Sequence, residues 1–74
     1  MDKKIQVRFW HVPLKDVPYE HGAEFDYSSR KRNQIIDTVL GLGYSVMIRP
    51  MSKDKGYETD GILIWIDNGR FGQR

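Results

Sequence analysis

Two segments of alternating apolar residues constrain the fold of this chain more than any other feature of its sequence. In KIQVRFWHV, residues 4–12, Ile5, Val7 and Phe9 alternate with polar or aromatic residues. In GILIWID, residues 61–67, isoleucines take every second place. A two-residue period is typical of a β-strand that buries one face. We therefore expect both segments to be strands of a sheet whose two faces differ in chemistry.

An amphipathic helix and a third alternating segment complete the main predicted elements. The segment SRKRNQIIDTVLGLG, residues 29–43, carries isoleucine, valine and leucine on one face of a helix. The hydroxyl of Ser28 or Ser29 can cap its N-terminus, and one of its last two glycines ends it. The segment YSVMIRP, residues 44–50, again alternates and predicts a strand.

The remaining segments are expected to connect these elements. Residues 13–28 contain two prolines, a glycine and four acids without a clean period, which indicates a long ordered loop. Residues 51–60 form a polar connection that suits a turn. The Asn-Gly pair at 68–69 is typical of a hairpin turn, so a short strand over residues 70–74 is expected to fold back after it.

These elements predict an α+β fold. We expect a two-layer sandwich over a single domain, residues 1–74, with one helix on a three- to four-stranded, mostly antiparallel sheet. The order along the chain would be β-α-β-β, with a fourth strand at the end. A chain of 74 residues buries only about 60% of the surface that its unfolded form exposes, so its stability margin is thin. Small domains of this kind often oligomerise, and a homodimer is one expectation.

The composition points to an intracellular protein. The chain has no cysteine, which excludes disulfides and a cysteine-ligated metal and favours a cytoplasmic location. No apolar run approaches the ~20 residues that cross a bilayer, so no membrane association is expected. The start, MDKKIQVRFW, lacks the apolar segment of a signal peptide.

The sheet face opposite the helix is the first candidate for function. If the isoleucine face of the strands contacts the helix, the other face displays Arg8, Trp10, Met47, Arg49, Leu63 and Trp65. Tryptophan, methionine and arginine are enriched at protein interfaces, and a large exposed apolar patch usually marks a partner. The cover could be a foreign protein, a second copy of the chain or single-stranded nucleic acid that stacks on tryptophan. It could also be residues 13–28 of the same chain, folded under the sheet.

The charges are unevenly distributed. Residues 13–28 carry a net charge of −3, because Asp16, Glu20, Glu24 and Asp26 outweigh a single lysine, whereas the whole chain carries +2. An acidic segment suits a basic partner surface, since opposite charges speed association. A dedicated duplex-DNA binder usually has a larger positive excess, because its affinity comes largely from phosphate neutralisation. Acids near the tryptophan face would repel phosphate, which favours a protein partner.

No catalytic or metal signature is present. His11 and His21 lie near several acids in sequence but lack the spacing of a metal site, and the serines form no defined triad with them. The GLGYS segment lacks the lysine of a phosphate-binding loop. We therefore expect a binding protein without cofactor or metal, and not an enzyme.

Over its whole length, from MDKKIQVRFWHVPLKDVPYE to IDNGRFGQR, the chain resembles the small host-takeover proteins of bacteriophages. More specifically, it resembles staphylococcal phage inhibitors of the bacterial DNA sliding clamp, which are of similar length. The resemblance implies an inhibitor in the cytoplasm of the host cell that blocks DNA replication by binding the clamp, in one version by occupying its basic channel. A net charge of +2 does not suit a whole-molecule DNA mimic.

The sequence thus predicts a protein-binding inhibitor of a host protein, with the sliding clamp as the named partner. The residues expected to bind it are Asp16, Glu20, Glu24, Asp26, Arg8, Trp10, Arg49 and Trp65. The alternative is a single-stranded nucleic-acid module that uses the same Trp/Arg face together with Arg30, Lys31 and Arg32.

Overall fold

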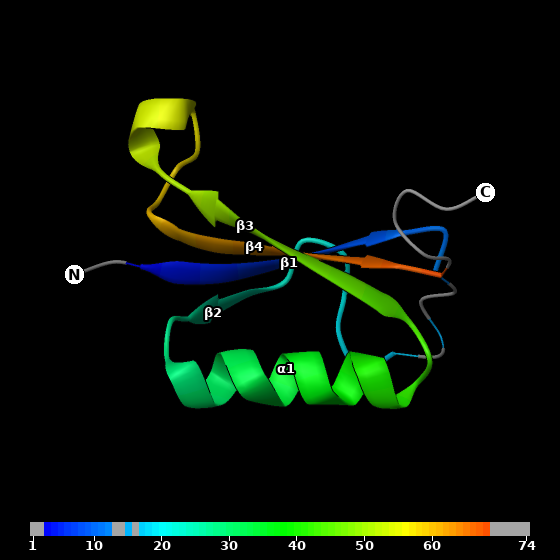
Figure 1. Ribbon diagram of the computed structural model, residues 1–74. Helices are drawn as coiled ribbons and strands as arrows, with labels where there is room; N and C mark the ends of the chain where they lie inside the picture. Colours follow the sequence, from blue (N-terminus) through cyan, green and yellow to red (C-terminus); the bar gives the residue numbers. More distant parts are fainter. Residues whose placement is uncertain (1–2, 13–14, 16, 69–74) are drawn as a thin grey trace.

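The computed structural model shows one helix packed on one face of a four-stranded sheet (Figure 1). It describes residues 3–12, 15 and 17–68. The elements in chain order are β1 (Lys4–Trp10), β2 (Glu24–Asp26), α1 (Ser29–Gly41), β3 (Ser45–Met51), the short 3-10 helix η2 (Lys53–Lys55) and β4 (Gly61–Asp67). The strands lie side by side in the order β2-β1-β4-β3. The predicted two-layer α+β fold is confirmed.

Two of the three seven-residue strands, β1 and β4, pair in parallel at the centre of the sheet. Their register runs from Lys4 opposite Gly61 to Trp10 opposite Asp67. The outer strands β2 and β3 pair antiparallel with β1 and β4 respectively, so the sheet is mixed. Because side chains alternate along each strand, this register aligns the apolar side chains of β1 and β4 on the same face.

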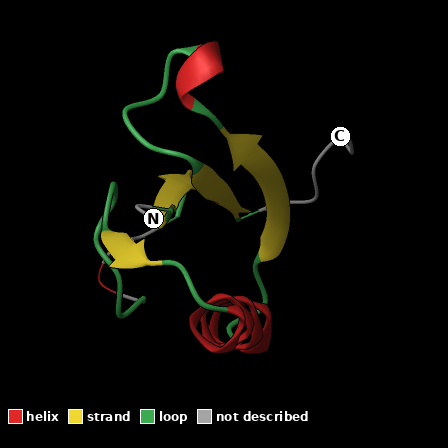
Figure 2. Ribbon diagram, turned by 90° about the vertical axis from the view of Figure 1, so that its left-hand side faces the viewer, coloured by secondary structure: helices red, strands yellow, loops and turns green. Residues whose placement is uncertain are grey.

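That face forms the core with α1, which lies beneath it in the end-on view (Figure 2). Ile5 and Val7 of β1, Ile64 of β4, and Ile35 and Val39 of α1 have no exposed surface. Burying an aliphatic side chain of this size contributes roughly 1.5–3 kcal/mol, so these few residues supply much of the free energy of folding. The core therefore lies between α1 and the central strand pair.

Local signals at the ends of α1 match the sequence prediction. The Ser28 hydroxyl accepts a hydrogen bond from the Lys31 amide at 3.0 Å and caps the N-terminus. The helix ends at Gly41, and Gly43 follows with a φ of 91°. Glycine adopts this left-handed conformation without the penalty that a Cβ atom brings.

The fourth strand differs from the one that the sequence predicted. It is β2, inside the segment expected to be a loop, and it pairs with residues 4–6 at the edge of the sheet. A strand of three residues, Glu-Phe-Asp, is too short to show a period, so its pairing is set by β1 and not by its own sequence. The expected strand over residues 70–74 lies outside the described residues.

The first strand is also shorter than predicted. It ends at Trp10 because His11 has a φ of 60°, which takes the backbone out of the extended region. The polar connection 51–60 contains η2, which Ser52 caps by accepting a hydrogen bond from the Asp54 amide at 3.1 Å. This connection rises above the sheet on the side opposite α1 (Figure 2).

A substitution of Gly61, at the start of β4, tests the pairing of β1 with β4. The φ of Gly61 is 145°, and a Cβ atom built there would overlap the backbone of Lys4, so Gly61→Ala must displace the start of the parallel pair. We expect a loss of about 2 kcal/mol or more in the free energy of unfolding, measured by urea denaturation. Gly41→Ala is the control, because nothing lies near its Cβ position, and it should be neutral or stabilising by up to about 1 kcal/mol. Equal stability of the two variants would contradict the close approach of β1 and β4.

Candidate functional site

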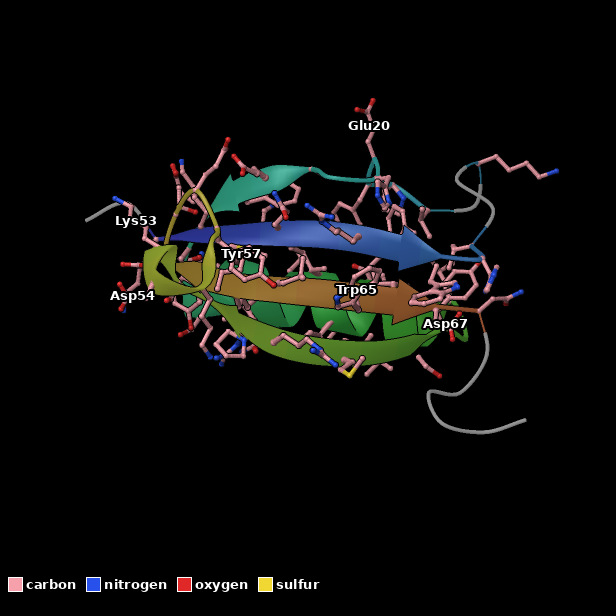
Figure 3. The ribbon with its side chains drawn as sticks, turned by 90° about the horizontal axis from the view of Figure 1, so that it is seen from above. Glu20, Lys53, Asp54, Tyr57, Trp65 and Asp67 are labelled. Carbon is pink, nitrogen blue, oxygen red and sulfur yellow. The ribbon has the colours of Figure 1, made fainter. Side chains whose placement is uncertain are left out.

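The sheet face opposite α1, which we call the open face, carries the predicted tryptophan and arginine residues. The register of the sheet places Arg8 beside Trp65, and Trp65 beside Met47. On the next row of the same face, Arg49 lies beside Leu63. Figure 3 looks down on this face, with Trp65 on β4 between the flanking strands. The structure therefore brings together Arg8, Trp10, Arg49 and Trp65 as the sequence predicted.

The two tryptophans contact each other at one end of the open face. Their ring centroids are 5.7 Å apart and the rings are tilted by 50°. Trp10 is 50% exposed, and its indole Nε1 donates to Nε2 of His11 at 3.1 Å. Tilted aromatic pairs at this distance attract each other, so the pair is held in place while much of Trp10 stays in water. Removing such an aromatic surface from water lowers the free energy, so its burial by a partner favours binding.

A cavity of about 360 Å³ lies next to the tryptophan pair. Its lining consists of apolar, aromatic and basic side chains, namely Arg8, Trp10, Met47, Arg49, Tyr57, Leu63 and Trp65. Tyr57 comes from the connection before β4 and lies over the sheet on the same face as Trp65 (Figure 3). The connection thus supplies one wall of the cavity.

Leu63 corrects one detail of the prediction. The sequence placed it among exposed residues of this face, but it is only 3% exposed. Met51, at the end of β3, is also buried, although it lies on the same face. The 52–60 connection lies over this end of the face (Figure 3), whereas Trp10, at the other end of β1, is half exposed. Sequence reasoning missed Tyr57 because its segment reads as a polar turn, and a lone aromatic residue within that turn was its one signal.

The acidic residues predicted to bind a partner lie, where described, at the β2 edge of the sheet or beyond it. Glu24 accepts a hydrogen bond from Gln6 Nε2 at 3.3 Å, and Asp26 forms an ion pair with Lys4 at 2.6 Å. Both therefore lie at the β2 edge with partners on β1. Glu20 is exposed at a turn and points outward, beyond that edge (Figure 3). Asp16 lies outside the described residues.

Among the described residues, the arginines of the open face have no carboxylate partner. Nε of Arg8 donates to Oε1 of Gln6 at 3.0 Å, which leaves its two terminal nitrogens for other contacts. Arg49 is exposed. Within residues 3–12, 15 and 17–68, neither arginine forms an ion pair. The charge at the cavity is therefore positive and uncompensated by these residues.

The described residues of the 13–28 segment do not cover the tryptophans. Its described apolar residues, Val17, Tyr19, Phe25 and Tyr27, pack against the core cluster formed with α1. Tyr19 and Phe25 make an edge-to-face contact with centroids 5.9 Å apart. With Trp10 half exposed, the alternative in which this segment buries both tryptophans is wrong for the described residues.

The basic residues at the start of α1 lie in the helical layer, on the other side of the sheet from the open face (Figure 1). Nζ of Lys31 lies 4.6 Å from the centroid of the Phe25 ring, a cation–π contact. Arg32 donates to the Tyr27 hydroxyl at 3.3 Å. These cations thus pack locally and form no continuous surface with the tryptophan pair.

The two histidines have local partners. Nδ1 of His21 accepts a hydrogen bond from the Phe9 amide at 3.1 Å, and Nδ1 of His11 lies 3.9 Å from Oδ1 of the buried Asp67. In the described part of the chain, no three histidine or acidic side chains gather closely enough to hold a metal ion. None of the helices there is long and apolar enough to span a membrane.

Comparison of the chain with protein-family models, with curated proteins and with solved structures returned no match.

The Lys4–Asp26 pair generates a pH prediction. The hydrogen bond from Lys4, strengthened by its ammonium charge, lowers the pKa of the Asp26 carboxyl below its ordinary value. A lowered pKa in the folded chain means that the pair stabilises the fold above the unfolded-state pKa and that this contribution is lost as pH falls through the folded-state pKa. In an NMR titration of the carboxyl carbon, Lys4→Met should raise the pKa of Asp26. Lys55→Met, which removes an exposed lysine from η2, should leave it unchanged, and an identical titration in both variants would contradict the ion pair.

Proposed function

We propose that this chain is a non-enzymatic protein-binding domain that inhibits a host protein through the open face of its sheet. The observation that carries the proposal is the half-exposed Trp10 held against Trp65 at the end of the open face that no described segment covers. Tryptophan and arginine are the residue types that most often dominate binding energy at protein interfaces. The resemblance to phage inhibitors makes the bacterial DNA sliding clamp the first partner to test, with a block of DNA replication as the result.

The charge arrangement favours a protein over nucleic acid as the partner. A single-stranded nucleic acid needs a groove of positive charge that follows its backbone, beside aromatic stacking platforms. On the open face, Glu24 and Asp26 border the β2 edge, and the buried Asp67 lies at the Trp10 end. The basic residues at the start of α1 belong to the other layer of the molecule. A continuous path for phosphates is therefore absent from the described surface.

Nucleic acid remains the second candidate because of one observation. Two tryptophans in contact, beside arginines without carboxylate partners, are also what stacking bases and phosphates require. Phosphate binding weakens steeply with salt, whereas an apolar protein contact does not. Capture of a partner from bacterial lysate, with and without nuclease, separates the two candidates.

Trp10→Ala is the direct test of the proposed interface. If Trp10 is a dominant contact, its truncation should weaken binding to the purified sliding clamp about 30-fold, measured by calorimetry or surface plasmon resonance. Leu40→Ala is the matched control, because Leu40 is 52% exposed but lies on α1, and its binding should match that of the unaltered chain. Circular dichroism should show that both variants remain folded.

Several outcomes would contradict this assignment. Equal binding by both variants would move the interface away from the open face. Unfolding of Trp10→Ala would show that Trp10 supports the core, and Arg49→Glu, at an exposed position, would then test the same face. A concentration-dependent mass in solution that Trp10→Ala abolishes would show that a second copy of the chain covers the tryptophans.

A further inference from the structure

We propose that the cavity of the open face binds an acidic protein segment that carries an aromatic or large aliphatic side chain beside its carboxylates. This inference rests on the proposed function and specifies the chemistry of the partner at the same site. It follows from two properties of the cavity, its apolar lining and its unpartnered positive charges.

The lining determines what enters the cavity. Trp65, Tyr57 and Leu63 come from one continuous stretch of chain, the connection and β4, while Met47 adds a flexible thioether from β3. At about 360 Å³, the cavity lies near the lower end of the range for small-ligand sites. It therefore suits one large side chain and the backbone next to it, and not an extended apolar surface. Methionine adapts to side chains of different shape, which fits either an aromatic or an aliphatic anchor.

The charges determine what surrounds the anchor. Arg8 and Arg49 come from strands on either side of β4, so they flank the cavity from two directions. Arginine presents several donors in a planar arrangement and pairs with carboxylates through two parallel hydrogen bonds. Within the described residues neither arginine has an ion pair, whereas Asp26 on the same face already has Lys4. The partner therefore supplies the missing carboxylates on both sides of its anchor.

The same arrangement argues for a peptide over an oligonucleotide. Two separate guanidinium groups match two or more carboxylates around one side chain. A nucleic acid would extend phosphates beyond them, toward Glu24 at the β2 edge or Glu58 in the connection, both of which border the neighbouring cavity at Arg8. Repulsion from those carboxylates acts on every phosphate that extends past the arginines, so it opposes a long polyanion more strongly than a short acidic segment.

The test uses three pentapeptides as probes, titrated into the full chain labelled with nitrogen-15. The first is Asp-Asp-Phe-Asp-Asp, the second replaces its aspartates by asparagine, and the third replaces phenylalanine by alanine. NMR follows the indole N–H signals of Trp10 and Trp65. The acidic phenylalanine peptide should shift both signals saturably and bind about tenfold tighter than either other peptide. Arg49→Gln should remove this advantage, while Lys55→Gln, the same loss of charge on η2, should retain it.

The other outcomes overturn either this inference or the proposed function. Equal binding of the asparagine peptide would show that the arginines do not select carboxylates, and equal binding of the alanine peptide would show that the cavity takes no anchor. Tighter binding of a short oligothymidylate at the same ionic strength would assign the face to nucleic acid. If the acidic peptide fails while Trp10→Ala still abolishes clamp binding, this inference falls and the proposed function stands. If the peptide binds while Trp10→Ala leaves clamp binding intact, the proposed function falls instead.

Discussion

The parallel pairing of β1 with β4 is the constraint on which the rest of this structure depends. Over seven residue pairs it aligns two alternating segments, so that Ile5, Val7 and Phe9 of β1 each lie opposite an isoleucine of β4. A shift of one residue would bring the tryptophans into the core and the isoleucines into water. The same register that creates the core against α1 therefore creates the open face.

The two faces differ in how completely they are covered. A helix of 13 residues covers the isoleucine face together with aromatic residues from the 13–28 segment. On the other face, the described segment that lies over the sheet is the 52–60 connection, which buries Leu63 and Met51 at one end. Within residues 3–12, 15 and 17–68, no segment covers the Trp10 end, and Trp10 stays half exposed. The exposure of Trp10 thus depends on which segments fold over which face. It leaves an exposed aromatic surface at one end of the sheet.

The distribution of charge separates the two layers functionally. Cations at the start of α1 pack on Phe25 and Tyr27, where they support the seam between the helix and β2. The acids of β2 are engaged by Lys4 and Gln6. Among the described residues, the positive charges of Arg8 and Arg49 at the cavity form no ion pair. A modest net charge therefore conceals a local excess of positive charge at the cavity.

The sequence by itself determined the elements whose side chains repeat with a strong period, and hence the sheet, the helix and the composition of both faces. The alternation of β1 and β4 predicted that Arg8, Trp10 and Trp65 share a face, because successive side chains along a strand point to opposite faces of the sheet. Only the tertiary structure decided the parallel pairing, the strand β2 and the burial of Leu63. Each of these depends on contacts between segments distant in sequence, which local periodicity does not encode. Tyr57 is the clearest case, since a residue in a polar turn becomes a wall of the cavity only after the chain has folded over the sheet.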